Sequence, residues 1–360
     1  MKNNLAYLYG EPTATGDLRT KMSDFVVLER LPFTPSGTGE HLLIKVRKTG
    51  VNTVIVARQL AKYFGVKEAM VTYAGLKDRF AVTEQWFGVH LPGKTIDDLS
   101  QLTIDGVELL SYKRHDKKLR IGALTGNKFE ITLRSVVNAD DLVRRWYAVV
   151  EHGVPNYYGE QRFGIEGGNI EKAKAMFAGA KVKDRKKRSI YLSAARSYLF
   201  NALVSERVKN NHFDTLNVGD VMMLAGTQSI FLLDKVDEIA EQRFSEKDID
   251  LTACLWGAGE LKTTGTTAKK EYALVEKYPD ICQGLIKFGL KQERRRIRLS
   301  LSDAEIKVEE QNAESDQKKC KVTLKFSLPA GCFATTILRE LLVYNDLTER
   351  VHAGTHERDN

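Results

Sequence analysis

Alternating apolar and polar residues predict strands in the first and the last part of the chain. The alternation is clearest in the segments 24–29, 41–47, 85–91, 129–134 and 321–327. Each segment has the length of an ordinary strand. A period of two residues is typical of a strand that buries one face and exposes the other.

Apolar residues three or four positions apart predict helices between these strands. The first helix begins at Asn52 or Thr53, buries a stripe that includes Val54 and Phe64, and ends before Gly65. The other predicted helices lie at 139–150, 169–178, 193–208 (capped by Ser193) and 333–344. Because strands and helices follow one another without a regular β–α–β rhythm, the pattern favours an α+β fold.

The length and the composition suggest two domains. A chain of 360 residues can form two units, each with its own core. The residue pattern changes after Gly153, Val154 and Pro155, where aromatic residues begin to alternate with basic and polar ones. We therefore expect a domain boundary near residue 153.

The charge of the chain favours an acidic partner. The formal net charge is +8 and the pI is near 9.1. Basic residues gather in the segments 113–120, 181–188 and 291–298. One such run is usually a solvated face, but three in a cationic chain favour a nucleic-acid surface. The candidate RNA contacts are Lys117, Lys118, Arg120, Arg185, Lys186 and Lys187. No helix-turn-helix, zinc-finger or RRM signature is present, which fits recognition of structured RNA by shape and backbone.

A short loop before the strand at 85–91 carries the most distinctive charge pattern. Gly75 suits a turn position with positive φ. Asp78 follows and lies between Lys77 and Arg79 in the sequence. Two cations at such a short distance favour an ionised carboxylate. Such a carboxylate could act as an anionic nucleophile on a polyanionic substrate. From the loop alone, a solvated charged turn is the favoured interpretation.

Two residues on one predicted strand could line a pocket for a base. Asn127 and Phe129 are two positions apart, so their side chains share a face. Phe129 could stack on a nucleobase, and Asn127 could hydrogen-bond a carboxylate or the substrate. The alternative is a core phenylalanine beside Ile131, and the same alternative applies to Phe25 and Phe333.

Other classes of site and location are disfavoured. The four cysteines form no Cys-x-x-Cys pair and have no histidine at ligand spacing, which argues against zinc and for buried free thiols. No glycine-rich segment completes a nucleotide-binding motif. The first residues lack the apolar core of a signal peptide, and no run approaches the ~18 apolar residues of a membrane span. We expect a soluble cytoplasmic protein without metal or membrane contact.

The run Gly75-Leu76-Lys77-Asp78-Arg79, with Ala81, Thr83 and Gln85, resembles the catalytic motif of the TruD family of tRNA pseudouridine synthases. Further segments are similar to that family and follow its order from about residue 16 to residue 341. They are 24–29, 39–41, 48–53, 117–122, 126–129, 156–164, 193–197, 328–335 and 338–341. One of these matches could arise by chance, but the whole series in order is highly specific.

The resemblance implies a V-shaped, two-domain α+β protein. Its catalytic domain would have a central, mainly antiparallel sheet and would be formed by two segments, 1–152 and 308–346. The family's own inserted domain would occupy 153–307, and 347–360 would be a frayed tail.

The resemblance also implies a reaction, the isomerisation of uridine to pseudouridine at position 13 of tRNA. The uridine would be flipped out, its glycosidic bond cleaved and its C5 joined to the ribose, with no metal or organic cofactor and no protein partner. Asp78 would be the catalytic carboxylate, acting as a nucleophile at C1′ or as a base on the ribose.

Other residues receive supporting roles from the same resemblance. Phe129 would stack on the uracil, while Phe25, Asn127 and Phe333 would hold the substrate. Arg19 stands where the family usually has a lysine, and it would pair with Asp78. The alternatives are a catalytically silent RNA-binding or chaperone protein and an unrelated RNA-modifying enzyme such as a methyltransferase.

Overall fold

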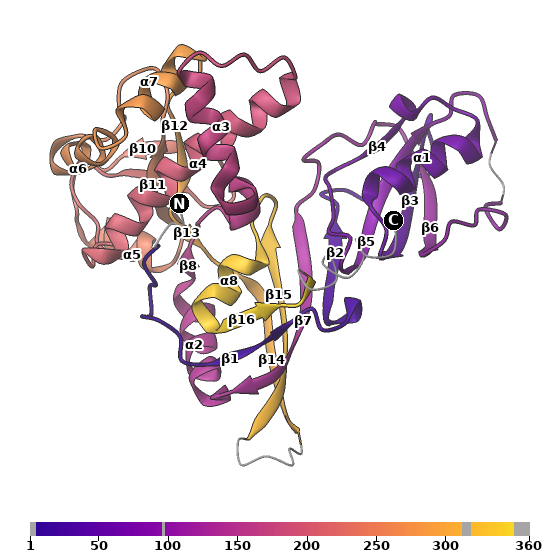
Figure 1. The fold of residues 1–360 in the computed structure, drawn as a ribbon, viewed down its shortest axis with the longest axis horizontal. Helices are drawn as coiled ribbons and strands as arrows, with labels where there is room; N and C mark the ends of the chain where they lie inside the picture. The colour runs from indigo at the N-terminus through magenta and orange to yellow at the C-terminus, as the bar shows by residue number, and fades with distance from the viewer. Residues whose placement is uncertain (1–4, 96–97, 312–317, 349–360) are drawn as a thin grey trace. The chain divides into compact units, whose positions relative to one another are not determined.

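The computed structural model describes residues 5–95, 98–311 and 318–348, and the chain divides into two compact units (Figure 1). The sheet unit comprises Pro12–Val150, Leu301–Ala334 and Leu341–Asn360, and the helix-rich unit comprises Met1–Glu11, Glu151–Ser300 and Thr335–Glu340. In the part of the chain that the structure describes, no helix is long and apolar enough to cross a membrane.

One sheet dominates the sheet unit. Among the described residues its main path runs β14-β15-β7-β2-β5-β3-β6, while β1 joins β7 and β16, and β4 joins β5. The strands are β1 (Thr15–Leu18), β2 (Phe25–Arg30), β3 (His41–Thr49), β4 (Val71–Tyr73), β5 (Val82–His90), β6 (Val107–His115), β7 (Gly126–Val137), β14 (Ser302–Gln311), β15 (Lys319–Pro329) and β16 (Val343–Asp346). Among the strands that the structure describes in this sheet, only the β2–β5 and β1–β16 pairings are parallel. The expected α+β fold with a mainly antiparallel sheet is therefore confirmed.

The centre of the sheet joins segments that lie far apart in the sequence. Strand β15, near the C-terminus, pairs along β7, and β7 pairs on its other side with β2 (Figure 1). This register sets Phe129 opposite both Phe326 and Val27. Helix α2 (Ala139–His152) packs on the same layer through Trp146, whose ring centre lies 6.0 Å from that of Phe326.

The first predicted helix is α1 (Thr53–Phe64), and it ends as expected at Gly65 in the left-handed conformation, with φ of 63°. Its apolar face covers β3 and β5 through Leu60 and Phe64. The predicted stripe was wrong at one position, because Val54 is exposed and Val56 is buried in its place.

The helix-rich unit has its own core, built around one long helix. Its helices are α3 (Gly168–Phe177), α4 (Arg185–Lys209), α5 (Glu238–Ser245), α6 (Gly265–Val275) and α7 (Pro279–Lys287). Its strands are β8 (Val154–Pro155) with β13 (Arg298–Leu299), and β9 (Val221–Leu224), β10 (Ile230–Leu232), β11 (Ile249–Leu255) and β12 (Glu293–Arg296). Buried residues of α4 such as Leu199 and Phe200 lie at the centre of this core.

Two sequence predictions about this unit were wrong. Helix α4 begins at Arg185, not at Ser193, because the Asp184 side chain accepts hydrogen bonds from the backbone N–H groups of Lys186 and Lys187. The basic segment 291–298, expected to belong to a nucleic-acid surface, is partly buried. Its Arg294 side chain is buried and forms an ion pair with Glu271 at 2.8 Å.

The C-terminal region differs from the sequence prediction after residue 341. The helix expected over 333–344 is shorter, as α8 (Ala334–Leu341), and is followed by the unpredicted strand β16. Of the expected frayed tail, 349–360 lies outside the described residues. The division of the chain into a split catalytic domain and an inserted domain at 153–307 stays a prediction.

Candidate active site

Asp78 lies in the loop that joins β4 to β5. The two strands pair antiparallel, with Tyr73 at the end of β4 opposite Phe87. Strand β5 begins at Val82 and so extends beyond β4 on the side where the loop connects them. The prediction for Gly75 was wrong, since it is not among the residues with positive φ. Its carbonyl oxygen instead accepts a hydrogen bond of 2.6 Å from Gln85 Nε2.

Buried polar side chains anchor the backbone of this loop. The Thr53 hydroxyl donates to Gln85 Oε1 at 2.9 Å and accepts from the Lys77 N–H at 3.1 Å. Lys48 Nζ donates to the backbone carbonyl oxygen of Asp78 at 2.9 Å. Lys48 is fully buried, and its desolvation lowers the pKa of its ammonium group to about 8; Asp78 partly opposes this shift and Lys77 adds to it.

Each oxygen of the Asp78 carboxylate has one fixed partner. Oδ2 pairs with Arg19 Nη2 at 2.9 Å, and Oδ1 accepts from the Phe80 N–H at 3.0 Å. Both contacts fix the orientation of the carboxylate. Because 29% of the Asp78 side chain is exposed, the group is held in place and is still accessible to a substrate.

The cations beside Asp78 in the sequence are engaged elsewhere. Lys77 pairs with Glu29 at 2.6 Å, and both side chains are buried. Glu29 also accepts a hydrogen bond from the Trp86 N–H at 3.1 Å. Arg79 donates to the carbonyl oxygen of Gly50 at 3.2 Å. The cation in contact with the Asp78 carboxylate is therefore Arg19, 59 positions away in the sequence.

Arg19 is held by groups from three parts of the sheet unit. Its guanidinium carbon lies 4.3 Å from the centre of the Phe25 ring. Its Nη1 donates to Asp346 Oδ2, at the end of β16. Arg19 adopts a left-handed conformation with φ of 58° directly after β1.

Two of the three predicted aromatic residues, Phe25 and Phe129, form a cluster next to Arg19. The ring centres of Phe25 and Phe129 are 6.3 Å apart, edge to face, and Phe129 stacks on Phe326 at 5.4 Å. The side chains of Phe25 and Phe129 are both buried, with only a small exposed fraction. Asn127 lies on the same strand, β7, two residues before Phe129, and its buried Oδ1 has no hydrogen-bond partner in the described part of the chain. Phe333 is half-buried just before α8.

The six predicted RNA contacts are all exposed. Lys117, Lys118 and Arg120 follow β6 in the sheet unit. Arg185, Lys186 and Lys187 form the first turn of α4 in the helix-rich unit.

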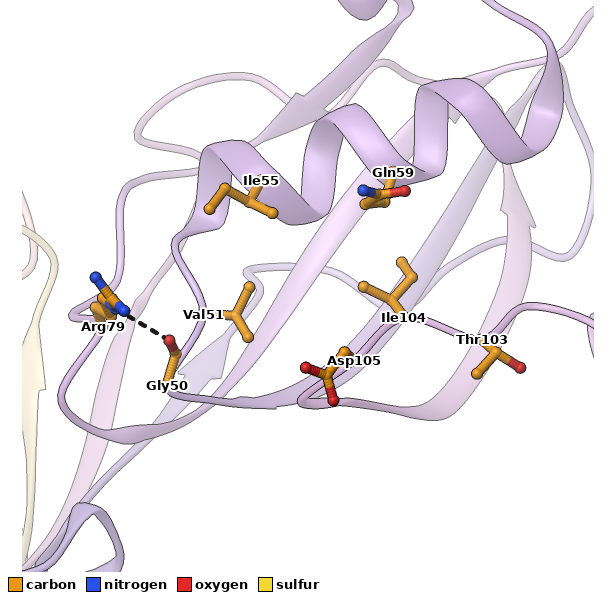
Figure 2. Close-up of a pocket in the computed structure, with 8 residues that line it drawn as sticks. All are labelled: Gly50, Val51, Ile55, Gln59, Arg79, Thr103, Ile104 and Asp105. Atoms are coloured by element: carbon orange, nitrogen blue, oxygen red, sulfur yellow. Dashed lines mark hydrogen bonds between the residues drawn. The ribbon is translucent and has the colours of Figure 1, made fainter. Parts of the chain in front are cut away.

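A pocket of about 380 Å³ opens beside Arg79 (Figure 2). Its lining residues are Gly50, Val51, Ile55, Gln59, Arg79, Thr103, Ile104 and Asp105. Figure 2 shows the Arg79 side chain turned to the Gly50 carbonyl at one end, with Ile55 and Gln59 contributed by α1. Over the described ranges no group of three or more His, Cys, Asp or Glu side chains is placed to hold a metal.

Sequence reasoning missed three polar residues of the site. Lys48 and Glu29 lie in segments that resemble the family, so their position there was a signal that could have found them. Asp346 lies beyond the last such segment and in a strand that was not predicted. Its place beside Arg19 follows only from the pairing of β1 with β16.

Comparisons with known proteins identify the family of this chain. The family model described as tRNA pseudouridine synthase D (TruD) matches residues 2–173 and 169–341. A tRNA pseudouridine synthase D of Colwellia psychrerythraea is 58% identical over 349 residues, 96% of this chain and 95% of that protein. One of Shewanella oneidensis is 49% identical over 348 residues, 96% and 91% respectively.

A crystal structure of a putative tRNA pseudouridine synthase D from Methanosarcina mazei shares the fold. It superposes with a TM-score of 0.69 at 19% identity and covers 94% of both chains. Taken with the family match over most of the sequence, these similarities show that the chain belongs to the tRNA pseudouridine synthase D (TruD) family of isomerases.

Proposed function

We propose that this protein converts uridine to pseudouridine at position 13 of tRNA in the cytoplasm, with Asp78 as the catalytic carboxylate. The observation that carries the proposal is the anchoring of Asp78. Thr53 and Lys48 hydrogen-bond the backbone of its loop, and Arg19 pairs with its carboxylate. Part of the Asp78 side chain still faces solvent.

The proposed reaction requires one carboxylate that is held at the ribose of the target nucleotide. The N1–C1′ bond of the nucleotide breaks and a C5–C1′ bond forms. C5 loses its proton and N1 gains one, either the same proton or one exchanged with solvent, so the product is an isomer of the substrate. Asp78 assists either by attacking C1′ or by removing a proton from the ribose. Both roles require a carboxylate in a fixed orientation, and the Arg19 guanidinium and the Phe80 N–H each bind one of its oxygens.

The target base must leave its stack to reach Asp78, at a cost of a few kcal/mol. Stacking on an aromatic ring returns about 1–3 kcal/mol per base. The cluster of Phe25 and Phe129 beside Arg19 supports this role, and the unpartnered Oδ1 of Asn127 supports a hydrogen bond to the substrate. The exposed basic residues of both units would contact the phosphate backbone.

The test is to incubate the protein with unmodified tRNA, without added cofactor, and to map pseudouridine by carbodiimide modification and primer extension. We expect one new stop that reports position 13. A stop elsewhere would keep the chemistry and overturn the position. Tight tRNA binding without any stop would favour a silent RNA-binding or chaperone protein.

A further inference from the structure

The pairing of β1 with β16 brings a second carboxylate to Arg19. The two strands run parallel, with Leu18 opposite Asp346, and the Leu347 N–H donates to the Leu18 carbonyl oxygen at 3.1 Å. Arg19 is the next residue, and its positive φ marks a sharp change of direction after the strand. A side chain otherwise remote in sequence is therefore fixed beside Arg19.

The guanidinium group of Arg19 is shared between two acids. Nη1 donates to Asp346 Oδ2, and Nη2 donates to Asp78 Oδ2 at 2.9 Å. The Arg19 side chain is only 7% exposed, and its buried Nε has no polar partner within the described residues. With the Phe25 ring over one face, the two carboxylates are the polar groups that hold the orientation of the guanidinium.

Asp346 is itself fixed on its other side. Its Oδ1 accepts hydrogen bonds from the Thr348 N–H at 3.2 Å and from the Thr348 hydroxyl at 2.9 Å. The carboxylate is thus a rigid acceptor, and not a mobile surface group that happens to lie near an arginine.

We propose that Asp346 is a positioning residue for the isomerisation and acts on Asp78 through Arg19. The inference rests on the proposed function. By occupying Nη1, Asp346 removes the end-on bidentate pair that Nη1 and Nη2 together would otherwise form with the two oxygens of Asp78. Asp78 Oδ1 then keeps its bond to the Phe80 N–H, and one lone pair of each oxygen stays available for the substrate.

The two-acid arrangement also explains why arginine suits this chain. A guanidinium has separate N–H groups that can bind two carboxylates in one plane, whereas an ammonium is a single point charge. We therefore expect Asp346 to matter only while residue 19 is arginine. In an Arg19→Lys background, removal of the Asp346 charge should change the rate much less than it does in the parent.

The experiment compares kcat and KM on unmodified tRNA for the parent, Asp346→Asn, Arg19→Lys and the double variant. Asp17→Asn is the matched control, since Asp17 lies on β1 and contacts Asn345 at 3.3 Å but not Arg19. We expect Asp346→Asn to lower kcat about ten-fold, the loss of one charged hydrogen bond, with KM nearly unchanged. Asp17→Asn should behave like the parent.

The outcomes separate this inference from the proposed function. An inactive parent would overturn the proposed function, and the inference with it. An active parent with Asp346→Asn at full kcat, or with equal losses from Asp346→Asn in both backgrounds, would overturn the inference alone. If Asp346→Asn does not fold, Thr348→Val replaces it; we expect a several-fold lower kcat at constant KM, and an unchanged kcat would overturn the inference.

Discussion

Lys48 donates a hydrogen bond of 2.9 Å to the backbone carbonyl oxygen of Asp78, from a side chain with no solvent exposure. A buried ammonium group loses its hydration, which is costly unless it has compensating partners. This destabilising burial occurs beside the loop that carries the proposed catalytic residue. We infer that Lys48 serves to fix the loop and does not add to general stability.

The burial of Lys48 predicts a pH dependence of stability. Its pKa is about 8 in the folded protein and near 10.5 when unfolded. Below pH 8 both states bind the proton and the cost of burial is fully present. Between pH 8 and 10.5 the unfolded state binds more protons, so stability rises with pH. We expect the free energy of unfolding of the parent, relative to Lys48→Met, to rise by at most about 3 kcal/mol across this range.

Urea unfolding at pH 7.5 and at pH 10 measures this difference, and the subtraction cancels groups that titrate alike in both proteins. Lys62→Met, at an exposed position of α1, is the control. A difference between the parent and Lys48→Met that does not change with pH would contradict the account.

The ion pair of Glu29 with Lys77 should contribute to folding more than surface pairs do. Glu29→Gln removes the charge opposite a buried ammonium, and breaking such a pair costs about 3–5 kcal/mol. Glu40→Gln is the matched control, because the pair of Glu40 with His90 is exposed and should be worth less than about 1 kcal/mol. Equal urea midpoints for the two variants would show that the buried pair has no special weight.

Phe129 serves the core as well as the proposed stacking role, so the choice of substitution matters. Phe129→Ala would leave a cavity and cost about 3–5 kcal/mol of stability. Phe129→Leu nearly keeps the volume, so we expect it to fold and to lower kcat/KM about ten-fold through lost stacking. Phe326→Leu changes the other ring of the stacked pair and should keep its activity. Equal losses for both leucine variants would favour a purely structural role for Phe129.

The basic first turn of α4 should contribute to tRNA affinity. Reversing the charges of Arg185, Lys186 and Lys187 should weaken binding and reduce the slope of log K against log salt by about one per lost phosphate contact. The Asp184 cap binds backbone N–H groups and survives these changes. Lys269→Glu with Lys270→Glu, at exposed positions of α6, tests for a general charge effect. The same slope for all the proteins would remove this cluster from the interface.

Local patterns were sufficient to predict the central strands of the large sheet and α1, but not α5, α6 and α7 of the helix-rich unit. The strands at the centre of the sheet alternate cleanly, and α1 ends at a glycine in the left-handed conformation, as its sequence indicates. Sequence reasoning failed where tertiary contacts override local preference. The arginines of segment 291–298 look like a surface run, yet Arg294 is paired with Glu271 in the core.

The site was predictable in its centre and not in its surroundings. Asp78 and Arg19 lie in recognisable segments, and the structure brings them together. The contact of Asp346 with Arg19 spans 327 positions and depends on the pairing of two short strands. Neither periodicity nor spacing reports such a contact, because it arises only when the sheet is complete.

The central claim, that Asp78 performs the chemistry, is tested most directly by comparing the parent with Asp78→Asn in single-turnover pseudouridine formation and in tRNA binding. Asp234→Asn, an exposed acid of the helix-rich unit, is the control. We expect Asp78→Asn to bind tRNA with nearly parental affinity and to form no pseudouridine at position 13, while Asp234→Asn stays active. Pseudouridine formed by Asp78→Asn at the parental rate would contradict the account.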